Sequence, residues 1–200
     1  MTIAEPSLRV RKKLRTWDAI AASGARLFAR QGFAATTLDQ IAELACVHKQ
    51  TVLRYFKSKQ DIALAYQTRA LESFRRGLVD PGRGDSVIDY WRAHVRRSAR
   101  GLVAMGGAAA LQPIIDSDPR LLAHAAAIEH QYQDLIAEAL SREAGVDPAA
   151  DVHAIALSGL LVGGNYAMAR RVRERGAPAD LERAVLAVVD FAVRTFPPRV

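Results

Sequence analysis

Residues 37–56 read TLDQIAELACVHKQTVLRYF, and they predict two short helices separated by a tight turn. Thr37 is followed three residues later by Gln40, which is the capping-box pattern that begins a helix. An apolar stripe at helical spacing ends near residue 44, so the first helix is short. The second helix is expected over about 48–56. Two short helices joined in this way are typical of a helix-turn-helix unit.

The second of these helices has one apolar side and one polar side. At 100° per residue, a contiguous arc holds Gln50, Thr51, Arg54 and Tyr55, and Val52 lies on the other side. Arginine suits guanine, glutamine suits adenine, and hydroxyl groups suit phosphates. The arc therefore predicts a recognition helix in a DNA major groove, although an ordinary solvated face has the same composition.

Cys46 and His48 raise a competing reading, because a thiol and an imidazole also build catalytic and metal sites. On a helix, side chains two residues apart point away from each other. Residues 45–56 hold no Asp, Asn or Glu to orient the histidine, and the sequence holds no second cysteine for a zinc site. A P-loop and a dinucleotide-binding glycine motif are also absent from the sequence. We therefore expect no enzyme, no catalytic residue, no metal ligand and no cofactor.

The positive charge of the chain is confined to its first part. Residues 1–60 contain 11 Lys and Arg against 4 Asp and Glu, and residues 61–200 contain 17 of each. The whole net charge of +7 therefore belongs to the first segment, which predicts a polyanionic partner such as DNA. Within it, residues 1–15 form a basic arm that is expected to follow phosphates or to enter a minor groove, with a disordered tail in the free protein as the alternative.

The chain is expected to be all-α, because apolar residues recur at helical spacing nearly throughout and strand-like alternation does not persist. One cysteine permits no internal disulfide and fits a reducing compartment. The longest apolar stretches are shorter than the roughly 20 residues of a membrane span, so a cytoplasmic protein without a membrane partner is predicted. The expected helices cover residues 16–30, 38–44, 48–56, 58–78, 86–102, 106–116, 119–143, 148–174 and 179–195.

The segment from Thr16 to Leu64 resembles the DNA-binding domain of the TetR family of bacterial repressors, over about a quarter of the chain. The residues that fit the family pattern are Phe28, Gly32, Phe33, Thr36, Thr37, Ile41, Ala42, Ala45, Val47, Thr51, Val52, Tyr55, Phe56, Ser58, Lys59 and Ile62. The resemblance implies a basic arm (1–15), a helix-turn-helix domain (16–62) and a helical ligand-binding and dimerisation domain (63–200), joined by a linking helix. The DNA contacts that it implies are Thr37, Lys49, Gln50, Thr51, Arg54, Tyr55 and Lys59.

Three residues depart from the family pattern. Cys46 replaces the glycine of the turn, which raises the question of an unusual backbone angle there. His48 replaces the usual Ser or Thr at the start of the recognition helix, so this cap is expected to be weaker. Leu53 replaces a frequent tyrosine and is expected to exchange a polar DNA contact for an apolar one.

The second part of the chain is expected to bind an effector and a second copy of the chain. The apolar runs 154–169 and 184–196 suit a four-helix dimer interface, with an intramolecular core as the alternative. Isolated polar tips among apolar residues are the composition of a small-molecule pocket, although each residue alone is more often an ordinary core residue. The candidates are Trp91, His94, Met105, Gln112, His124, Ile128, Tyr132, Asn165 and Tyr166.

The function predicted from these features is a ligand-responsive transcriptional repressor. It would bind a palindromic DNA operator as a homodimer, and a small, largely apolar ligand would release it. The alternative is a helical small-molecule-binding or catalytic protein with a vestigial helix-turn-helix.

Overall fold

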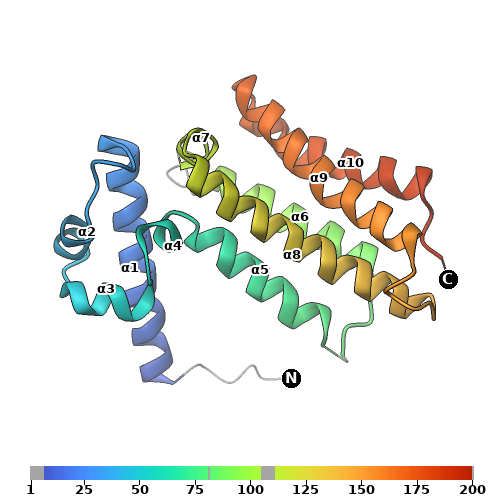
Figure 1. Ribbon diagram of the computed structural model, residues 1–200, viewed down its shortest axis with the longest axis horizontal. Helices are drawn as coiled ribbons and strands as arrows, with labels where there is room; N and C mark the ends of the chain where they lie inside the picture. Colours follow the sequence, from blue (N-terminus) through green and yellow to red (C-terminus); the bar gives the residue numbers. More distant parts are fainter. Residues whose placement is uncertain (1–6, 81, 105–110, 200) are drawn as a thin grey trace. The chain divides into compact units, whose positions relative to one another are not determined.

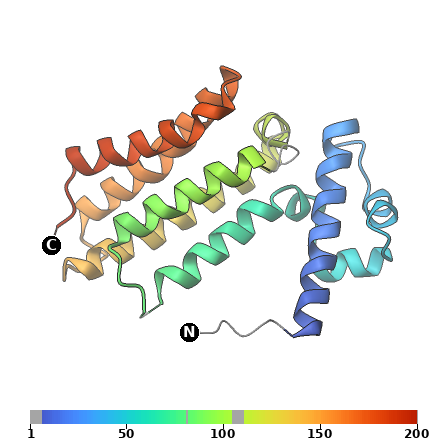
Figure 2. The ribbon, with the colours of Figure 1, turned by 180° about the vertical axis from the view of Figure 1, so that it is seen from behind.

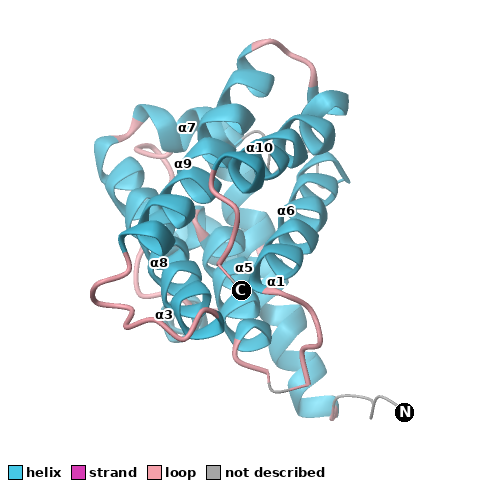
Figure 3. Cartoon of the chain, turned by 90° about the vertical axis from the view of Figure 1, so that its right-hand side faces the viewer, coloured by secondary structure: helices cyan, strands magenta, loops and turns pink. Residues whose placement is uncertain are grey.

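The computed structural model describes residues 7–80, 82–104 and 111–199, and every regular element within these ranges is a helix (Figure 3). The predicted all-α fold class is therefore confirmed. The helices are α1 (Leu8–Gln31), α2 (Leu38–Leu44), α3 (Lys49–Tyr55), α4 (Lys59–Ala63), α5 (Ala65–Leu78), α6 (Val87–Ala104), α7 (Gln112–Ser117), α8 (Pro119–Glu143), α9 (Val152–Glu174), the 3₁₀ turn η2 (Pro178–Asp180) and α10 (Leu181–Thr195).

The described residues divide into two compact units. The first contains residues 7–66 and 111–124, and the second contains residues 67–104 and 125–199. The division falls within α5 and within α8, so both of these helices pass from one unit to the other.

The first helix begins eight residues before the predicted residue 16. Ser7 is its N-cap, and the Ser7 side chain accepts a hydrogen bond from the Val10 amide at 3.4 Å. Leucine, arginine and lysine are good helix formers, and they dominate the segment that follows. Residues 8–15 of the basic arm are therefore helical and exposed, which the prediction of a disordered tail missed. Helix α1 ends at Gln31, and its C-cap is Gly32, whose φ of 84° favours glycine.

The helix-turn-helix consists of α2 and α3, which lie beside α1 (Figure 1). The predicted capping box of α2 is present, since Thr37 and Gln40 exchange hydrogen bonds between side chain and backbone. Cys46 in the turn has a φ of +53°, so the unusual backbone angle anticipated from its place in the sequence is found. His48 makes no capping hydrogen bond with its side chain, as expected of a weaker cap.

A close approach between α1 and α4 holds this unit together. A methyl group on Gly24 would lie 2.3 Å from Cγ2 of Ile62, a distance that only a glycine permits. The side chain of Ile62 is buried, so it has little freedom to move away. The core around this contact is made of apolar side chains from the first four helices and from the residues that follow α1 and α3, including Ile20, Leu27, Phe28, Phe33, Ile41, Val52 and Phe56.

The single helix predicted over 58–78 is two helices. Ser58 and Asp61 form a capping box at the start of α4, as the sequence pattern indicated. The chain then departs from helical geometry at Leu64, where φ is −102° and ψ is 14°. Residues 62–65 are all buried, and one face of a straight helix cannot bury four consecutive side chains. The break follows from that requirement.

In the second unit, α10 packs against both α6 and α9 (Figures 1 and 2). Ion pairs support the contact with α6: Arg92 with Asp190, Arg96 with Glu182 at 3.6 Å, and Arg100 with Glu182 at 2.8 Å. The hydrogen bond to Arg100 lowers the pKa of the Glu182 carboxyl.

Helix α9 begins four residues later than predicted, because Asp151 caps it by accepting from the Ala154 amide at 3.1 Å. Helix α7 begins at residue 112, and the earlier residues of the predicted segment 106–116 lie outside the described ranges, apart from Leu111.

Among the described helices, α9 is long and apolar enough to cross a membrane by length and composition alone. A core helix passes the same test. Leu157, Leu161 and Val162 of α9 are fully buried, and the helix packs against α10, which fits a core helix.

Candidate DNA-binding face and effector site

The exposed face of α3 is rotated away from the predicted arc. Gln50 and Arg54 are exposed, as is Leu53, whereas Thr51 and Tyr55 are half-buried at the edge of the face. The prediction located the DNA-binding arc from the polarity of the side chains alone. In the structure, the packing of the buried Val52 sets the orientation of α3, and so decides which side chains are exposed. The guanidinium of Arg54 lies 5.7 Å from the centre of the Tyr55 ring, where a cation–π contact holds it beside the exposed face.

Thr37 and Lys49 are exposed, at the N-termini of α2 and α3. The Thr37 hydroxyl accepts a hydrogen bond from the Gln40 amide at 3.2 Å. Lys49 donates to the carboxylate of Asp39 at 2.8 Å, which links α3 to α2. Both partners of this pair are well exposed, so the pair contributes little to stability and leaves Lys49 free to exchange partners.

Lys59 occupies a different environment from the other predicted DNA contacts. Its ammonium donates to the carbonyls of Phe33, Ala34 and Thr36, at 2.8, 3.3 and 2.9 Å. It also lies 4.6 Å from the centre of the Phe33 ring. These carbonyls belong to the loop that leads into the cap of α2, so Lys59 joins the start of α4 to this loop. Three acceptors match the three protons of an ammonium, which leaves none for a phosphate in this geometry.

Replacing Lys59 by methionine should destabilise the first unit, because the three carbonyls lose their charged donor while an unbranched apolar side chain, one atom shorter, remains. We expect the free energy of unfolding to fall by about 2 kcal/mol in urea titrations. Lys57→Met is the matched control, since Lys57 is exposed and its loss should change stability by less than about 0.5 kcal/mol. Equal stability of the two variants would show that the contacts of Lys59 do not hold the loop.

In the second unit, four rings from three helices form a buried cluster: Phe74 of α5, Trp91 and His94 of α6, and Tyr132 of α8. Every pair among them is in contact, with ring centres between 4.8 and 5.6 Å apart. Three of the predicted effector residues are thus brought together. Phe74 was missed, because contacts between rings on different helices leave no pattern in the sequence.

The polar groups of this ring cluster are neutral. Burial lowers the pKa of His94 to about 4, with Arg97 nearby adding to the effect. Burial raises the pKa of Tyr132, and that of Tyr166 on α9 in the same way. Nε1 of Trp91 is buried and has no hydrogen-bond partner among the described residues, and the same holds for the side-chain amide of Asn165. Such groups provide hydrogen-bonding capacity that a bound molecule can satisfy.

The low pKa of His94 predicts a specific dependence of stability on pH. Between pH 6.5 and 4 the unfolded chain binds a proton on this residue and the folded chain does not, so stability falls as the pH falls. From pH 7 to pH 5 the wild type should lose about 2 kcal/mol more than the His94→Phe variant. Urea titrations of both proteins at the two pH values measure this difference. Identical losses would mean that His94 is not held neutral.

The other predicted effector residues are dispersed. Met105 lies outside the described residues. Gln112 and His124 belong to the first unit, and the Gln112 amide donates to Asp116 of its own helix at 3.0 Å. Ile128 is buried on α8, and Asn165 is buried on α9.

An apolar groove of about 340 Å³ runs along the exposed side of α9 and α10. It is lined by Leu160, Gly164, Ala167, Met168, Arg171, Ala187, Val188 and Phe191. Phe191 is 54% exposed and contributes a large apolar surface to this groove. These helices contain the two runs that the sequence analysis assigned to dimerisation.

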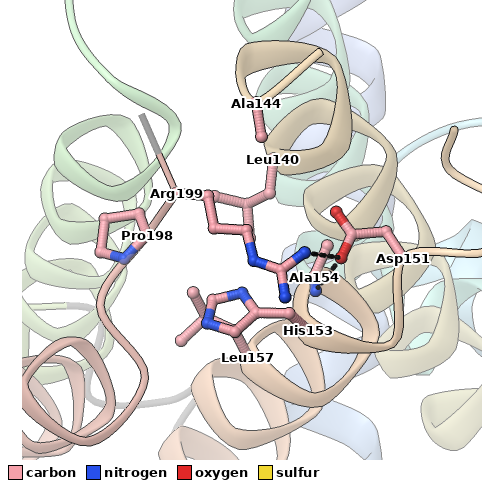
Figure 4. Close-up of a pocket in the computed structure, with 8 residues that line it drawn as sticks. All are labelled: Leu140, Ala144, Asp151, His153, Ala154, Leu157, Pro198 and Arg199. Carbon is pink, nitrogen blue, oxygen red and sulfur yellow. Dashed lines mark hydrogen bonds and ion pairs between the residues drawn. The ribbon is translucent and has the colours of Figure 1, made fainter. Parts of the chain in front are cut away.

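A second hollow lies where the C-terminal segment meets the start of α9 (Figure 4). It holds only about 10 Å³, which leaves room for no more than a water molecule. The guanidinium of Arg199 lies 3.7 Å from the buried carboxylate of Asp151, and the hydrogen bond from the Ala154 amide lowers the pKa of that carboxyl. This arrangement fastens the C-terminus to the cap of α9.

Across the described residues, no group of three or more His, Cys, Asp or Glu side chains is arranged to hold a metal.

Residues 20–66 match the family model described as bacterial regulatory proteins of the tetR family. The chain is similar to the HTH-type transcriptional regulator TcmR of Streptomyces glaucescens, with 32% identity over 149 residues. The aligned region covers 71% of this chain and 66% of TcmR, which is slightly under two thirds of the length of TcmR.

Solved structures of two regulators share the fold. SmeT, the repressor of the Stenotrophomonas maltophilia multidrug efflux pump SmeDEF, has a TM-score of 0.66 and 19% identity, over 90% of this chain and 89% of that one. The fatty acid degradation regulator FadR of Bacillus halodurans has a TM-score of 0.64 and 18% identity, over 88% of this chain and 97% of the FadR chain. SmeT has also been solved in complex with triclosan, with a TM-score of 0.67 and 18% identity, over 90% of both chains. These relatives are transcriptional regulators and not enzymes.

Proposed function

Because the chain belongs to the TetR family of bacterial regulatory proteins, we propose that it is a transcriptional repressor that binds a palindromic DNA operator as a homodimer and is released by a small neutral ligand. The observation that carries the proposal is the exposed face of α3. A short helix in a helix-turn-helix presents Gln50 and Arg54 outward, within the segment that holds the whole net charge of the chain. This combination suits base edges in a major groove surrounded by phosphates.

The remaining contacts are assigned by their position around this face. Thr37, at the N-terminus of α2, and Tyr55 bind phosphates, whereas Lys49 exchanges Asp39 for a phosphate or a base. Thr51 is half-buried and reads a base only at the edge of the groove. The helical basic residues of α1, from Arg9 to Arg15, add phosphate contacts along one exposed segment. We reassign Lys59 to the support of the loop before α2.

The homodimer is proposed to form through the groove along α9 and α10. A four-helix interface would bury Phe191, Val188 and Leu160, which are apolar residues that line this groove. Two-fold symmetry of the protein would then match two-fold symmetry of the operator.

The effector site is proposed at the ring cluster of Phe74, Trp91, His94 and Tyr132. Its neutral polar groups favour an uncharged ligand, because a buried charge would find no opposite charge within the cluster. The complex of SmeT with triclosan supports a small aromatic ligand as the class to test first. Asn165 and Tyr166 of α9 are the further polar groups that such a ligand would reach.

The response to the ligand is proposed to be a population shift. Because α5 and α8 contribute to the ring cluster and also extend into the first unit, a ligand that separates the rings favours a different state of both helices. Within the first unit, Arg120 at the start of α8 lies 6.0 Å from the centre of the Phe33 ring, which also contacts Lys59. The ligand releases DNA only to the extent that it binds one state better than the other.

A gel-shift titration with the DNA upstream of the protein's own gene tests the proposal. We expect a shift that is selective over unrelated DNA, weakens steeply with salt, and is reversed by triclosan or a related neutral phenol. A shift that is equal on unrelated DNA would contradict the proposed repressor.

A further inference from the structure

We propose that Leu53 recognises the C5-methyl group of a thymine in the major groove, and so determines one base of each half-site. The inference rests on the proposed DNA-binding function. It names the base chemistry that the exposed face of α3 selects.

Leu53 is placed on this face by the packing of its neighbour. Val52 is fully buried and fills the core side of α3, which leaves Leu53 outside the core and 44% exposed. It lies three residues after Gln50 and directly before Arg54, which are both exposed hydrogen-bonding side chains of α3. Lys49 lies one turn before Leu53, and in the free protein its ammonium donates to Asp39 of α2 at 2.8 Å. Leu53 is therefore the apolar part of an otherwise polar face.

Among the base edges in the major groove, the methyl group of thymine is the apolar partner that suits Leu53. In the major groove, guanine, adenine and cytosine present hydrogen-bond donors and acceptors, and thymine adds an apolar methyl group. A leucine pressed against donors or acceptors would remove them from water without replacing their hydrogen bonds. Against a thymine methyl, it buries apolar surface on both sides. The face therefore discriminates in favour of a 5-methylpyrimidine at the position below Leu53.

The test removes the methyl group and nothing else. A duplex operator is obtained by selection with the wild-type protein, and each thymine is replaced singly by deoxyuridine, which pairs identically. At one thymine of each half-site, the replacement should weaken binding about fourfold, the effect expected from one methyl-sized group. Replacement in both half-sites should weaken it about 16-fold if the two effects multiply.

The variant Leu53→Ala should bind the thymine and uracil duplexes with equal affinity. The matched control is Leu44→Ala, which removes a leucine of similar exposure, 40%, from α2, and it should keep the difference between the two duplexes. At the same position, 5-methylcytosine paired with guanine should bind more tightly than cytosine paired with guanine.

Selective binding without any uracil-sensitive thymine would overturn this inference and leave the proposed function intact. Discrimination that persists in Leu53→Ala would overturn it as well. Failure to select any sequence would instead refute the proposed function, and this inference with it.

Discussion

Replacing Phe191 by aspartate should convert the protein into a monomer and abolish tight operator binding. Phe191 is large, apolar and 54% exposed beside Val188 and Leu160 in the groove along α9 and α10. The proposed dimer would bury this carboxylate in a groove whose lining is apolar apart from Arg171, which is unfavourable. Because each monomer would then hold a single half-site, the affinity for the full operator should fall by about 100- to 10,000-fold.

Analytical ultracentrifugation and operator titration measure the two effects on the same sample. The control is Val79→Asp, which introduces the same charge at a valine that is 59% exposed in the second unit and lies outside the groove. This control should remain dimeric and should bind the operator like the wild type. A dimeric Phe191→Asp variant would place the interface elsewhere.

Replacing Arg54 by alanine should relax the sequence preference of the protein more than it weakens general DNA binding. Arg54 is exposed on α3 and steadied by the ring of Tyr55. A bidentate contact between arginine and guanine is worth about 1–3 kcal/mol of discrimination against other bases. The affinity of each half-site should therefore fall by roughly 5- to 150-fold, and one base of the selected sequence should lose its preference.

Arg26→Ala provides a charge-matched control for this variant. Arg26 is an exposed residue of α1, so its removal changes the net charge equally without touching the face of α3. Competition binding with duplexes that differ at single positions compares the two variants. If Arg54→Ala kept the wild-type base preferences, Arg54 would be a phosphate contact instead of a base contact.

Local sequence signals predicted the helix-turn-helix well. The capping boxes at Thr37 and Ser58 depend on two residues three positions apart, so they can be read directly from the sequence. The positive φ of Cys46 was anticipated because the turn places a non-glycine residue where the family has glycine. The capping boxes can be inferred from neighbouring residues alone, whereas the angle at Cys46 also required comparison with the family pattern.

The features that the sequence did not reveal depend on packing between distant segments. Lys59 looked like a phosphate contact because it is basic and lies at the start of a helix, but its acceptors are carbonyls more than 20 residues away. The break at Leu64 follows from burial on more than one side, which a pattern of one apolar face does not express. The prediction did not include Leu53 in the exposed face of α3, and it placed Thr51 and Tyr55 within that face and not at its edge. Both differences arise because the packing of α3 decides which side chains are exposed.

Selection of bound sequences from a random duplex library tests the central claim most directly. The account predicts enrichment of a two-fold symmetric sequence whose half-site centres lie one helical turn or a multiple of it apart, about 10 base pairs per turn. Each half-site should contain a guanine read by Arg54 and a thymine read by Leu53, and Arg54→Ala should lose the preference for the guanine. A library that emerges without an enriched sequence, under salt conditions in which the protein still binds DNA, would contradict the account.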